Sequence, residues 1–564
     1  MCQFPKARLF TTIAVALLSI TFLTGRANSQ TTASLLAVKG NTSAALEHAT
    51  LVGHSDPNRV LNIVVSLKLR NEQELDALIE TQSDPRSPLY HQFIDAGEFT
   101  RRFGPLQSDV EAVAKHLRSQ GLTVHEIAPN HTLVVASGSA ATVERAFEVE
   151  INDYEFNGRI HFSNDRDPNV PAHLHGAIQS VIGLTSFDAP RRNSTAGTQS
   201  SPLFSYTPPQ IATAYNFPNQ NNAYPPRRNY SGRGVTLAIG TFFNFEPSDV
   251  EFFWQYFGIN RSGTLTYIPV NGGSNVINNE TSIDVEQSGA QAPGANLLVY
   301  AGPSPDHANF SLMLSRLTTD NIASVVTVSW DYCEAVVPFN NLATDHQTLK
   351  QGAAQGISYF IAAADAGAFA CYPLSSNPAV AYPASDPFVS AVGGTTLKVQ
   401  SNGTYGSETA WADSGGADSS IFPRPWWQFG LGVPPTSMRK ISDVAFDADP
   451  NTGYWFYFQG NWYSNQGGTS LGAPNWAALW TVGIEADGGR RTGNAAPLIY
   501  LVGNTPLYQT VFHDVTTGSN GCVIFVGCIG PGFSAGPFWD YPTGWGTPNG
   551  KSVVDLLRAV FGED

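Results

Sequence analysis

Histidine is scarce in the second half of the sequence. Of the 12 histidines, only His307, His346 and His513 follow residue 190, and none stands in a His-Gly-Thr context. A nucleophilic serine needs a base, and histidine is the usual one. The scarcity argues against a Ser-His-Asp enzyme, so a reactive serine in this part of the chain would need a different base.

Basic charge is also scarce. The chain has 31 Lys and Arg against 46 Asp and Glu, which gives a net charge of −15. This balance argues against a nucleic-acid partner. Hydrophobic residues make up 42% of the chain and charged residues 14%, which is a globular composition. The 564 residues exceed the roughly 100–200 of a single domain.

Long apolar runs are missing after the N-terminus, so no later segment predicts a membrane span. Residues 1–29 have the pattern of a secretory signal, with Lys6 and Arg8 before the uncharged stretch 9–24 and small residues at the end. A membrane anchor is the alternative, but the apolar stretch is short for a span of ~20 residues. We expect a secreted protein that is not attached to a membrane after the signal is removed.

Cysteine is rare as well. Cys2 would leave with the signal, and Cys333, Cys371, Cys522 and Cys528 remain. An even number in an exported chain favours two disulfides, for which three pairings are possible. Pairing Cys522 with Cys528 would close one short loop and leave Cys333 for Cys371. A metal site of all four is disfavoured because paired C-x-x-C spacing is absent.

Residues 30–188 are charged and predict a compact α+β domain. Apolar spacing favours three helices and three short strands, at 72–81, 107–120 and 141–147, and at 122–127, 132–137 and 148–156. The next segment, 189–202, is polar and ends in proline. It indicates a flexible linker in which Arg191 and Arg192 are accessible to a protease.

The pattern from residue 203 onward predicts an α/β domain. Short apolar runs alternate with helical stretches; the runs lie at 234–239, 295–300, 323–330, 357–363 and 388–392, and the helices at 280–292, 310–319 and 342–355. Continuous apolar strands that alternate with helices imply a parallel sheet buried on both faces.

Ser470 stands in a Gly-Gly-Thr-Ser-x-x-x-Pro run, which predicts a tight turn leading into a helix. Either Ser470 is only a turn residue, or its base is a carboxylate. Glu280 and Asp284 are four residues apart, so both lie on one face of the predicted helix. The alternative is an ordinary solvated pair of acids.

Three further acidic residues are candidates. Asp365 ends an apolar strand, where α/β folds place functional groups, although a loop aspartate that caps a turn would look the same. Asp514 and Asp540 bracket a loop. Two carboxylates with loop carbonyls suit Ca²⁺, and two ordinary turn aspartates are the alternative.

Taken in order, these motifs resemble the sedolisin family of serine-carboxyl peptidases, which includes the kumamolisins and tripeptidyl-peptidase I. The resemblance covers nearly everything after the signal. It rests on the E-x-x-x-D pair, the strand ending in Asp-x-Gly-Ala, the Gly-Thr-Ser-x-x-x-Pro turn and the Asp-Val-Thr, Gly-Pro-x-Trp-Asp and Thr-Gly-Trp-Gly-Thr-Pro segments. Residues 87–93, 99–103, 138–147 and 181–184 resemble the activation propeptide of the family.

The resemblance implies an architecture and an activity. Residues 203–564 would form a subtilisin-like parallel sheet flanked by helices, preceded by a ferredoxin-like α+β prodomain at 30–188 and a linker with the maturation cleavage at 189–202. The protein would be a self-processing, monomeric zymogen that hydrolyses peptide bonds in polypeptides through an acyl-enzyme. Its prodomain would act as intramolecular inhibitor and chaperone. An endopeptidase is expected, a tripeptidyl-peptidase is the alternative, and an inactive peptidase-like binding protein is a third interpretation.

The resemblance also implies residue roles. Ser470 would be the nucleophile, Glu280 its general base, Asp284 the residue that orients Glu280, and Asp365 the oxyanion-hole donor. One structural Ca²⁺ would be held by two carboxylates and three carbonyls, from Asp514, Asp540, Val515, Gly536 and Phe538.

Carboxyl chemistry accounts for a serine without histidine. At pH ~4 a histidine of pKa ~6.5 is protonated and useless as a base, whereas a glutamate is still partly ionised. Asp365 must be protonated to donate to an oxyanion, which requires acid or a raised pKa. The resemblance therefore predicts a bell-shaped pH profile with an acidic optimum.

Two positions depart from the family pattern. Asp331 stands where glycine is common on the substrate strand and would narrow a subsite or favour basic residues, and Thr241 replaces a supporting glutamate. Nine histidines precede residue 190, and we hypothesise that acid charges His91, His173 and His175 and loosens the prodomain. Ordinary surface histidines are the alternative.

Overall fold

A computed structural model describes residues 34–192, 195–196, 205–218, 229–523 and 527–561. The predicted signal, residues 1–29, lies outside this part of the chain, as does most of the predicted linker. Among the described residues, no helix combines the length and the apolar character that crossing a bilayer requires.

The N-terminal domain is built on a four-stranded antiparallel sheet in the order β4-β5-β3-β9. Helices α3 and α4 lie in the two connections β3–β4 and β5–β9, which is the ferredoxin-like topology. The elements run β3 (Val60–Leu67), α3 (Gln107–Ser119), β4 (Thr123–Ile127), β5 (Leu133–Ser139), α4 (Ala140–Phe147) and β9 (Ile178–Ile182). The predicted α+β prodomain fold is confirmed.

The amphipathic spacing that predicted α3 explains its packing. Val110, Val113 and Leu117 are buried in one cluster with strand residues such as Ile63 and Val65. Helices α1 (Glu72–Ser83) and α2 (Ala96–Arg102), the outer strands β1 (Leu35–Ala37), β2 (Thr50–His54), β6 (Ile151–Phe156), β7 (Arg159–Asn164) and β8 (Asn169–Pro171), and the short α5 (Ala172–His175) complete the domain.

The second domain contains an eight-stranded sheet, in the order β13-β14-β12-β15-β17-β19-β20, with β23 also paired to β19. All of its strands are parallel except β20. The strands are β12 (Thr236–Thr241), β13 (Leu265–Pro269), β14 (Asn296–Ala301), β15 (Val325–Val328), β17 (Ser358–Ala362), β19 (Ser390–Val399), β20 (Tyr405–Ala410) and β23 (Val444–Asp447). The predicted parallel sheet is confirmed.

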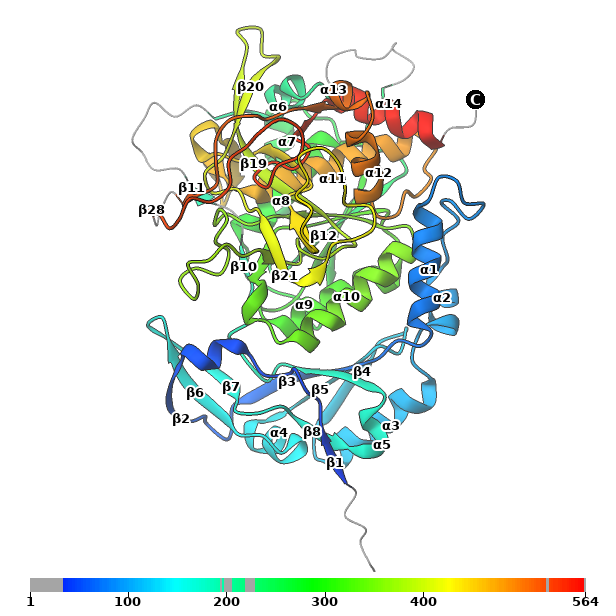
Figure 1. Cartoon of the computed structure of the whole chain (residues 1–564), viewed down its shortest axis with the longest axis vertical. Helices are drawn as coiled ribbons and strands as arrows, with labels where there is room; N and C mark the ends of the chain where they lie inside the picture. The colour runs from blue at the N-terminus through cyan, green and yellow to red at the C-terminus, as the bar shows by residue number, and fades with distance from the viewer. Residues whose placement is uncertain (1–33, 193–194, 197–204, 219–228, 524–526, 562–564) are drawn as a thin grey trace, which may run out of the picture.

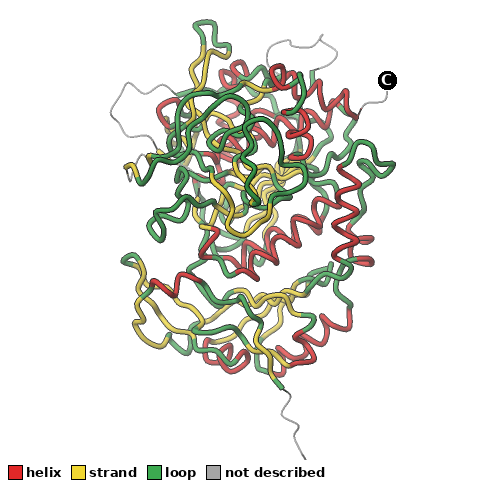
Figure 2. Tube along the Cα trace, in the orientation of Figure 1, coloured by secondary structure: helices red, strands yellow, loops and turns green. Residues whose placement is uncertain are grey.

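Helices cover both faces of this sheet (Figures 1 and 2). Alternate strand residues enter two different cores: Leu237 and Ile239 of β12 pack on the side of α8 and α11, and Ala238 packs on the side of α9 and α10. The helices are α8 (Asn279–Gln291), α9 (His307–Asp320), α10 (Phe339–Ala354) and α11 (Thr469–Ala486). This double burial accounts for strands that are apolar throughout.

The carboxyl ends of the parallel strands meet at one edge of the sheet. Thr241 ends β12, Ser329 follows β15, and Asp365 follows β17 by three residues. In open parallel sheets this edge forms the functional crevice.

The N-terminal domain docks on α9 and α10, beneath the large sheet in the view of Figure 1. Val64, Val135 and Ile182 of its sheet share one buried cluster with Leu312 of α9 and Leu349 of α10. The contact is apolar at its centre. At its margin, Lys350 of α10 lies 2.8 Å from both Glu72 and Asp76 of α1.

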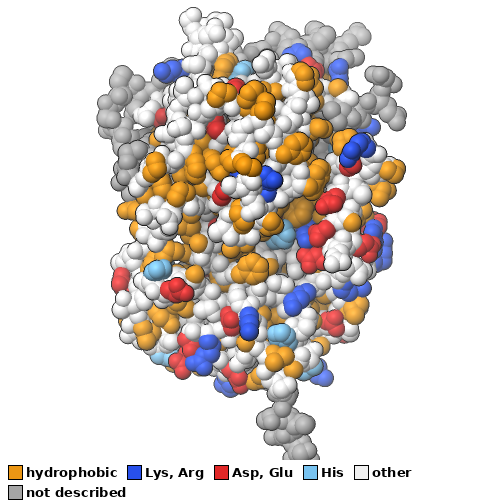
Figure 3. Space-filling view, in the orientation of Figure 1, with side chains coloured by type: hydrophobic (Ala, Val, Ile, Leu, Met, Phe, Trp, Pro, Cys, Tyr) orange, Lys and Arg blue, Asp and Glu red, His pale blue; other side chains and the backbone are white. Residues whose placement is uncertain are grey.

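The surfaces of the two domains differ in charge. Figure 3 shows charged side chains gathered on the N-terminal domain in the lower half of the view, while the upper half is dominated by apolar and uncharged polar side chains. The compositional difference that distinguished residues 30–188 in the sequence therefore separates the two domains in space.

The linker departs from its predicted flexibility. Residues Arg191–Arg192 form strand β10, which pairs antiparallel with β16 (Trp330–Cys333), and Thr195–Ala196 form β11, which pairs antiparallel with β25 (Asn461–Gly467). The prediction of a flexible linker is wrong for these four residues. The polar sequence of the linker does not reveal that the edges of β16 and β25 are available to pair with it.

One disulfide joins Cys333 of β16 to Cys371. Strands β27 (Cys522–Val523) and β28 (Gly527–Cys528) pair Cys522 opposite Cys528 along the backbone. The side chains of these two cysteines lie outside the described residues, so the second predicted disulfide stays a prediction.

Candidate active site

Helix α8 carries Glu280 and Asp284. The Asn278 side chain caps this helix by accepting a hydrogen bond from the Glu280 backbone N–H at 2.8 Å, which fixes Glu280 in the first turn. Both acids are 0% exposed, so the alternative of a solvated surface pair is wrong. Burial raises the pKa of the Asp284 carboxyl well above its usual range, and the charge of Glu280 raises it further.

Ser470 lies in the first turn of α11, next to α8. The turn before it requires glycine, because Gly468 has a φ of +119°, which residues with a Cβ rarely adopt. The Gly468 N–H donates to the Ala448 carbonyl at 2.7 Å, which fixes the turn against β23. Helices α8 and α11 pack against each other, and Ser470 is buried in the full chain.

Ser329 connects these two helices. Its hydroxyl donates to Asp284 Oδ1 at 2.8 Å and lies 3.5 Å from the Ser470 carbonyl oxygen. Sequence reasoning assigned no part to Ser329. The signal that could have identified it is its position directly after the buried strand β15, at the same sheet edge as Asp365.

Asp365 reaches the start of α11 from β17. Its Oδ1 accepts two hydrogen bonds from Thr469, one from the backbone N–H and one from Oγ1, both at 2.8 Å. Its Oδ2 is enclosed and has no hydrogen-bond partner among the described residues. The preceding Ala364 has a φ of +89°, a strained conformation of the kind found at functional sites.

The Asp365 carboxyl favours its protonated form. Burial raises its pKa well above the usual range, the two hydrogen bonds from Thr469 oppose this rise, and the charges of Asp413 and Glu280 add to it. The sequence-predicted residues Glu280, Asp284, Asp365 and Ser470 therefore meet at one buried place, with the Asp365 carboxyl next to the serine turn.

Thr241 supports helix α8, which carries Glu280, and it does so without a carboxylate of its own. Its hydroxyl lies 2.8 Å from the hydroxyl of Thr281, the residue after Glu280, and accepts a hydrogen bond from Trp330 Nε1 at 3.3 Å. The contact links β12 to α8 through neutral groups.

The loop predicted to bind calcium is formed by two segments of the C-terminal region. The Phe538 N–H donates to Asp514 Oδ2 at 3.1 Å, and the Gly536 N–H donates to Asp540 Oδ2 at 2.9 Å. Burial raises the pKa of Asp540 to about 7, and the charge of Asp514 adds to the shift. Val515 is buried beside them.

This oxygen-only set is compatible with a hard cation. The charges of Asp514 and Asp540 repel each other, and carboxylate oxygens are ligands that Ca²⁺ prefers. Within the described part of the chain, no cluster of three or more metal-ligating side chains exists, so any such site depends on main-chain oxygens.

Three comparisons cover both domains. Residues 47–187 match the family model of the Pro-kumamolisin activation domain. Sedolisin from Pseudomonas sp. (strain 101) is 29% identical over 531 residues, which cover 88% of this chain and 87% of that protein. Kumamolisin from Bacillus sp. (strain MN-32) is 30% identical over 533 residues, which cover 89% of this chain and 92% of that protein.

A solved structure agrees with the sequence matches. Pseudomonas sedolisin, a serine-carboxyl proteinase complexed with two molecules of pseudo-iodotyrostatin, covers 64% of this chain and 99% of its own, with 27% identity and a TM-score of 0.55. With the buried acids beside Ser470 and the activation domain at the N-terminus, these matches lead to one assignment. The chain belongs to the sedolisin family of serine-carboxyl peptidases.

Proposed function

We propose that the protein is an acid-active endopeptidase, made as a self-processing zymogen, in which Ser470 is the nucleophile and Glu280 its general base. The observation that carries the proposal is the pair of contacts around the serine turn: Asp365 bonded to Thr469, and Ser329 between Asp284 and Ser470. Three acids would then act on one serine, in place of the usual histidine.

The reaction follows from these positions. Ser470 Oγ attacks the carbonyl carbon while its proton passes to Glu280, and the carbonyl oxygen becomes an oxyanion that accepts a hydrogen bond from protonated Asp365. The C–N bond then breaks, Glu280 gives its proton to the leaving amine, and the acyl group stays on Ser470. Glu280 then takes a proton from a water molecule, which attacks the acyl carbon. The carboxylic acid product leaves as Glu280 returns the proton to Ser470 Oγ.

Asp284 and Ser329 are positioning residues in this scheme. A raised pKa keeps Asp284 protonated in acid, so the Asp284–Glu280 pair shares one proton and avoids two buried negative charges. The Ser329 hydroxyl holds Asp284 Oδ1 and thereby fixes the face that Asp284 presents to Glu280.

Cleavage within a chain is favoured over removal of terminal tripeptides. The linker pairs with β16 through Arg191 and with β25 through Thr195, and β25 leads through Gly468 to Ser470. A polypeptide can therefore extend along both sides of the serine, with the whole N-terminal domain attached upstream. Strand pairing on both sides of the serine suits an endopeptidase, whereas a tripeptidyl-peptidase needs a closed end.

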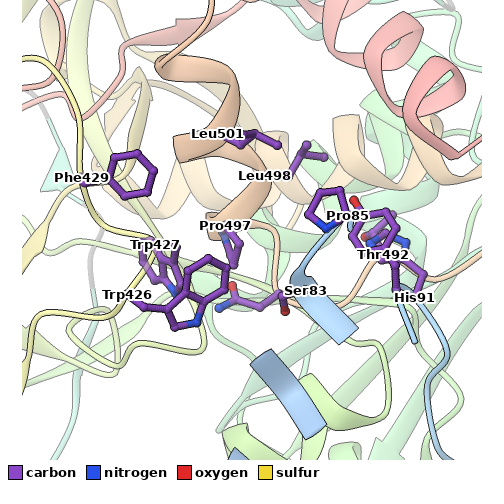
Figure 4. A pocket seen from close by; sticks show the side chains of 12 residues that line it. Ser83, Pro85, His91, Trp426, Trp427, Phe429, Thr492, Pro497, Leu498 and Leu501 are labelled. Carbon is purple, nitrogen blue, oxygen red and sulfur yellow. The ribbon is translucent and has the colours of Figure 1, made fainter. Parts of the chain in front are cut away.

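Acid release of the prodomain is supported at His91 in particular. His175 Nε2 donates to the Ala37 carbonyl, within its own domain, at 3.1 Å. His91 instead lines a cavity of about 70 Å³ between the domains, facing Trp427 and Leu498 of the peptidase domain (Figure 4). Burial lowers the pKa of His91 from 6.5 to about 4, and the charge of Arg490 contributes.

The sign of this shift favours release in acid. Docked His91 has the lower pKa, so the released prodomain binds more protons between pH 6.5 and about 4. Docking therefore weakens as pH falls through that window. Phe93, two residues on, packs so closely against Gly356 and Gly493 that an added Cβ would lie 2.5 and 2.8 Å from its ring, which ties this segment to the peptidase domain.

We also propose a structural Ca²⁺ held by the carboxylates of Asp514 and Asp540 and the carbonyls of Val515, Gly536 and Phe538. The ion would neutralise the buried Asp540 carboxylate and the exposed Asp514 carboxylate, and it would stiffen the C-terminal loop. Export is proposed as well. It is supported by the sequence of residues 1–29 and by the Cys333–Cys371 disulfide, a bond that persists in oxidising compartments.

Replacing the nucleophile should abolish self-processing. Ser470→Ala removes the attacking oxygen, and we expect conversion of the full chain to the mature form in acid to fall by on the order of 10⁶, measured as the shortened chain on denaturing gels. Ser248→Ala, at an exposed serine of α7 (Pro247–Tyr256), is the control and should process normally. Normal processing of the Ser470→Ala chain would refute the serine mechanism.

Replacing His91 should move activation to lower pH. His91→Gln removes the proton uptake that favours release, so processing at pH ~5 should slow relative to the unchanged chain, because that pH lies between the two pKa values. The measurement is processing rate against pH. His175→Gln is the matched control and should not shift the curve. Identical curves for His91→Gln and the unchanged chain would remove His91 as a trigger.

Removing calcium should destabilise the mature protein. When the free calcium concentration is about 100-fold above Kd, the bound ion adds ~2.7 kcal/mol to the free energy of unfolding. A chelator should therefore lower the thermal midpoint. Asp514→Asn should lower the midpoint and lose the response to chelator, while Asp555→Asn, at a surface pair with Lys551, should keep it. A response to chelator that is the same in the Asp514→Asn protein would place the ion elsewhere.

A further inference from the structure

The linker binds to strand β16 as an added strand, in the way that an extended peptide substrate could bind. Arg191 pairs with Asp331 and Arg192 pairs with Trp330, in antiparallel register. β16 begins directly after Ser329, which contacts both Asp284 and Ser470. Addition of a strand to a sheet edge is a general mode of peptide binding, in which main-chain bonds give affinity and side-chain pockets give specificity.

The described residues of the linker pair with the peptidase domain in a defined order. The linker residues on β16 come first, and Thr195 then pairs with Gly467, three residues before Ser470. A polypeptide bound in the same direction would place on β16 the residues that precede its scissile bond. The side chains that line β16 therefore contact the acyl part of a substrate.

The Arg191 side chain is held by two groups of the peptidase domain. Its Nε and Nη2 donate to Asp331 Oδ1 at 3.1 and 2.9 Å, and Nη2 also donates to the Ala370 carbonyl at 2.9 Å. Asp331 is only 3% exposed at its side chain, whereas Arg191 is 44% exposed. With the linker in place the carboxylate is nearly buried, and the arginine lies on the more open side of the contact.

The walls of this site are fixed by the surrounding structure. The disulfide between Cys333 and Cys371 joins β16 to the segment that carries Ala370. On the same strand, Tyr332 pairs with Tyr382 of β18 (Ala381–Tyr382). A carboxylate and a carbonyl held at fixed positions match the planar, multiply donating guanidinium of arginine better than the single ammonium of lysine.

We propose that Asp331 is a specificity-determining residue that selects an arginine in the substrate, on the acyl side of the scissile bond, with the Ala370 carbonyl completing the subsite. The inference rests on the proposed function and adds the substrate class: polypeptides with a basic residue upstream of the cleaved bond. The nearly buried Asp331 carboxylate favours a cationic side chain in the substrate. It repels an acidic side chain, and a neutral side chain would leave the carboxylate without the charge of an arginine beside it.

The test uses the mature protein and a peptide series that carries Arg, Lys, Leu or Glu at each position upstream of one fixed scissile bond. We expect arginine to be preferred at one position. Asp331→Asn should reduce the ratio of kcat/KM for the Arg peptide over the Leu peptide by about tenfold, mainly through KM, because the interaction is made in the ground state as well. Asp320→Asn, at a half-buried pair with Arg316 on α9, is the control and should keep the ratio.

Two outcomes would overturn the inference: an unchanged Arg-to-Leu ratio in Asp331→Asn, or no arginine preference in the unchanged protein. Failure of the proposed function would look different, because no peptide of the series would then be hydrolysed. If Asp331→Asn does not mature, the linker supplies the test. Arg191→Leu should slow self-processing about tenfold and Arg191→Lys should slow it less; equal rates for Arg191→Leu and the unchanged chain would also overturn the inference.

Discussion

The site depends on the burial of carboxyl groups against the first turn of one helix. Asp365 accepts two hydrogen bonds from Thr469, and Asp284 is held by Ser329, which also approaches Ser470. Burial raises the pKa of both acids. Groups that hold their protons in this way can donate hydrogen bonds at a pH where histidine would be charged. The proposed acid chemistry would thus follow from the packing of α8, α11 and the carboxyl edge of the parallel sheet.

The same sheet edges that would receive a substrate receive the protein's own linker. β10 pairs with β16 and β11 pairs with β25, while the ferredoxin-like domain rests on α9 and α10. In the proposed function, inhibition by the linker and recognition of a substrate would use one set of main-chain contacts. The ferredoxin-like sheet docks on the face opposite α8 and α11, whereas His91 lines a cavity with Trp427 and Leu498, which belong to the core cluster on the side of α8 and α11.

Local patterns predicted much of this arrangement and missed the long-range contacts. Helical spacing and buried strands gave α3, α8 and the parallel sheet, because each depends on neighbouring residues. The motifs at Glu280, Asp284, Asp365 and Ser470 led to the candidate site. The contact between Arg191 and Asp331 joins residues 140 positions apart. No local pattern predicts it, although the acidic departure at Asp331 already favoured basic side chains. Ser329 was missed because a serine after a strand is common.

The most direct measurement of the central claim is kcat/KM of the mature protein against pH, on an unfolded polypeptide. The account predicts a bell with its maximum in acid, because Glu280 must be ionised while Asp365 keeps its proton. It also predicts that Glu280→Gln abolishes the activity at every pH. A maximum near pH ~8, the range of a histidine base, with activity retained in Glu280→Gln, would contradict it.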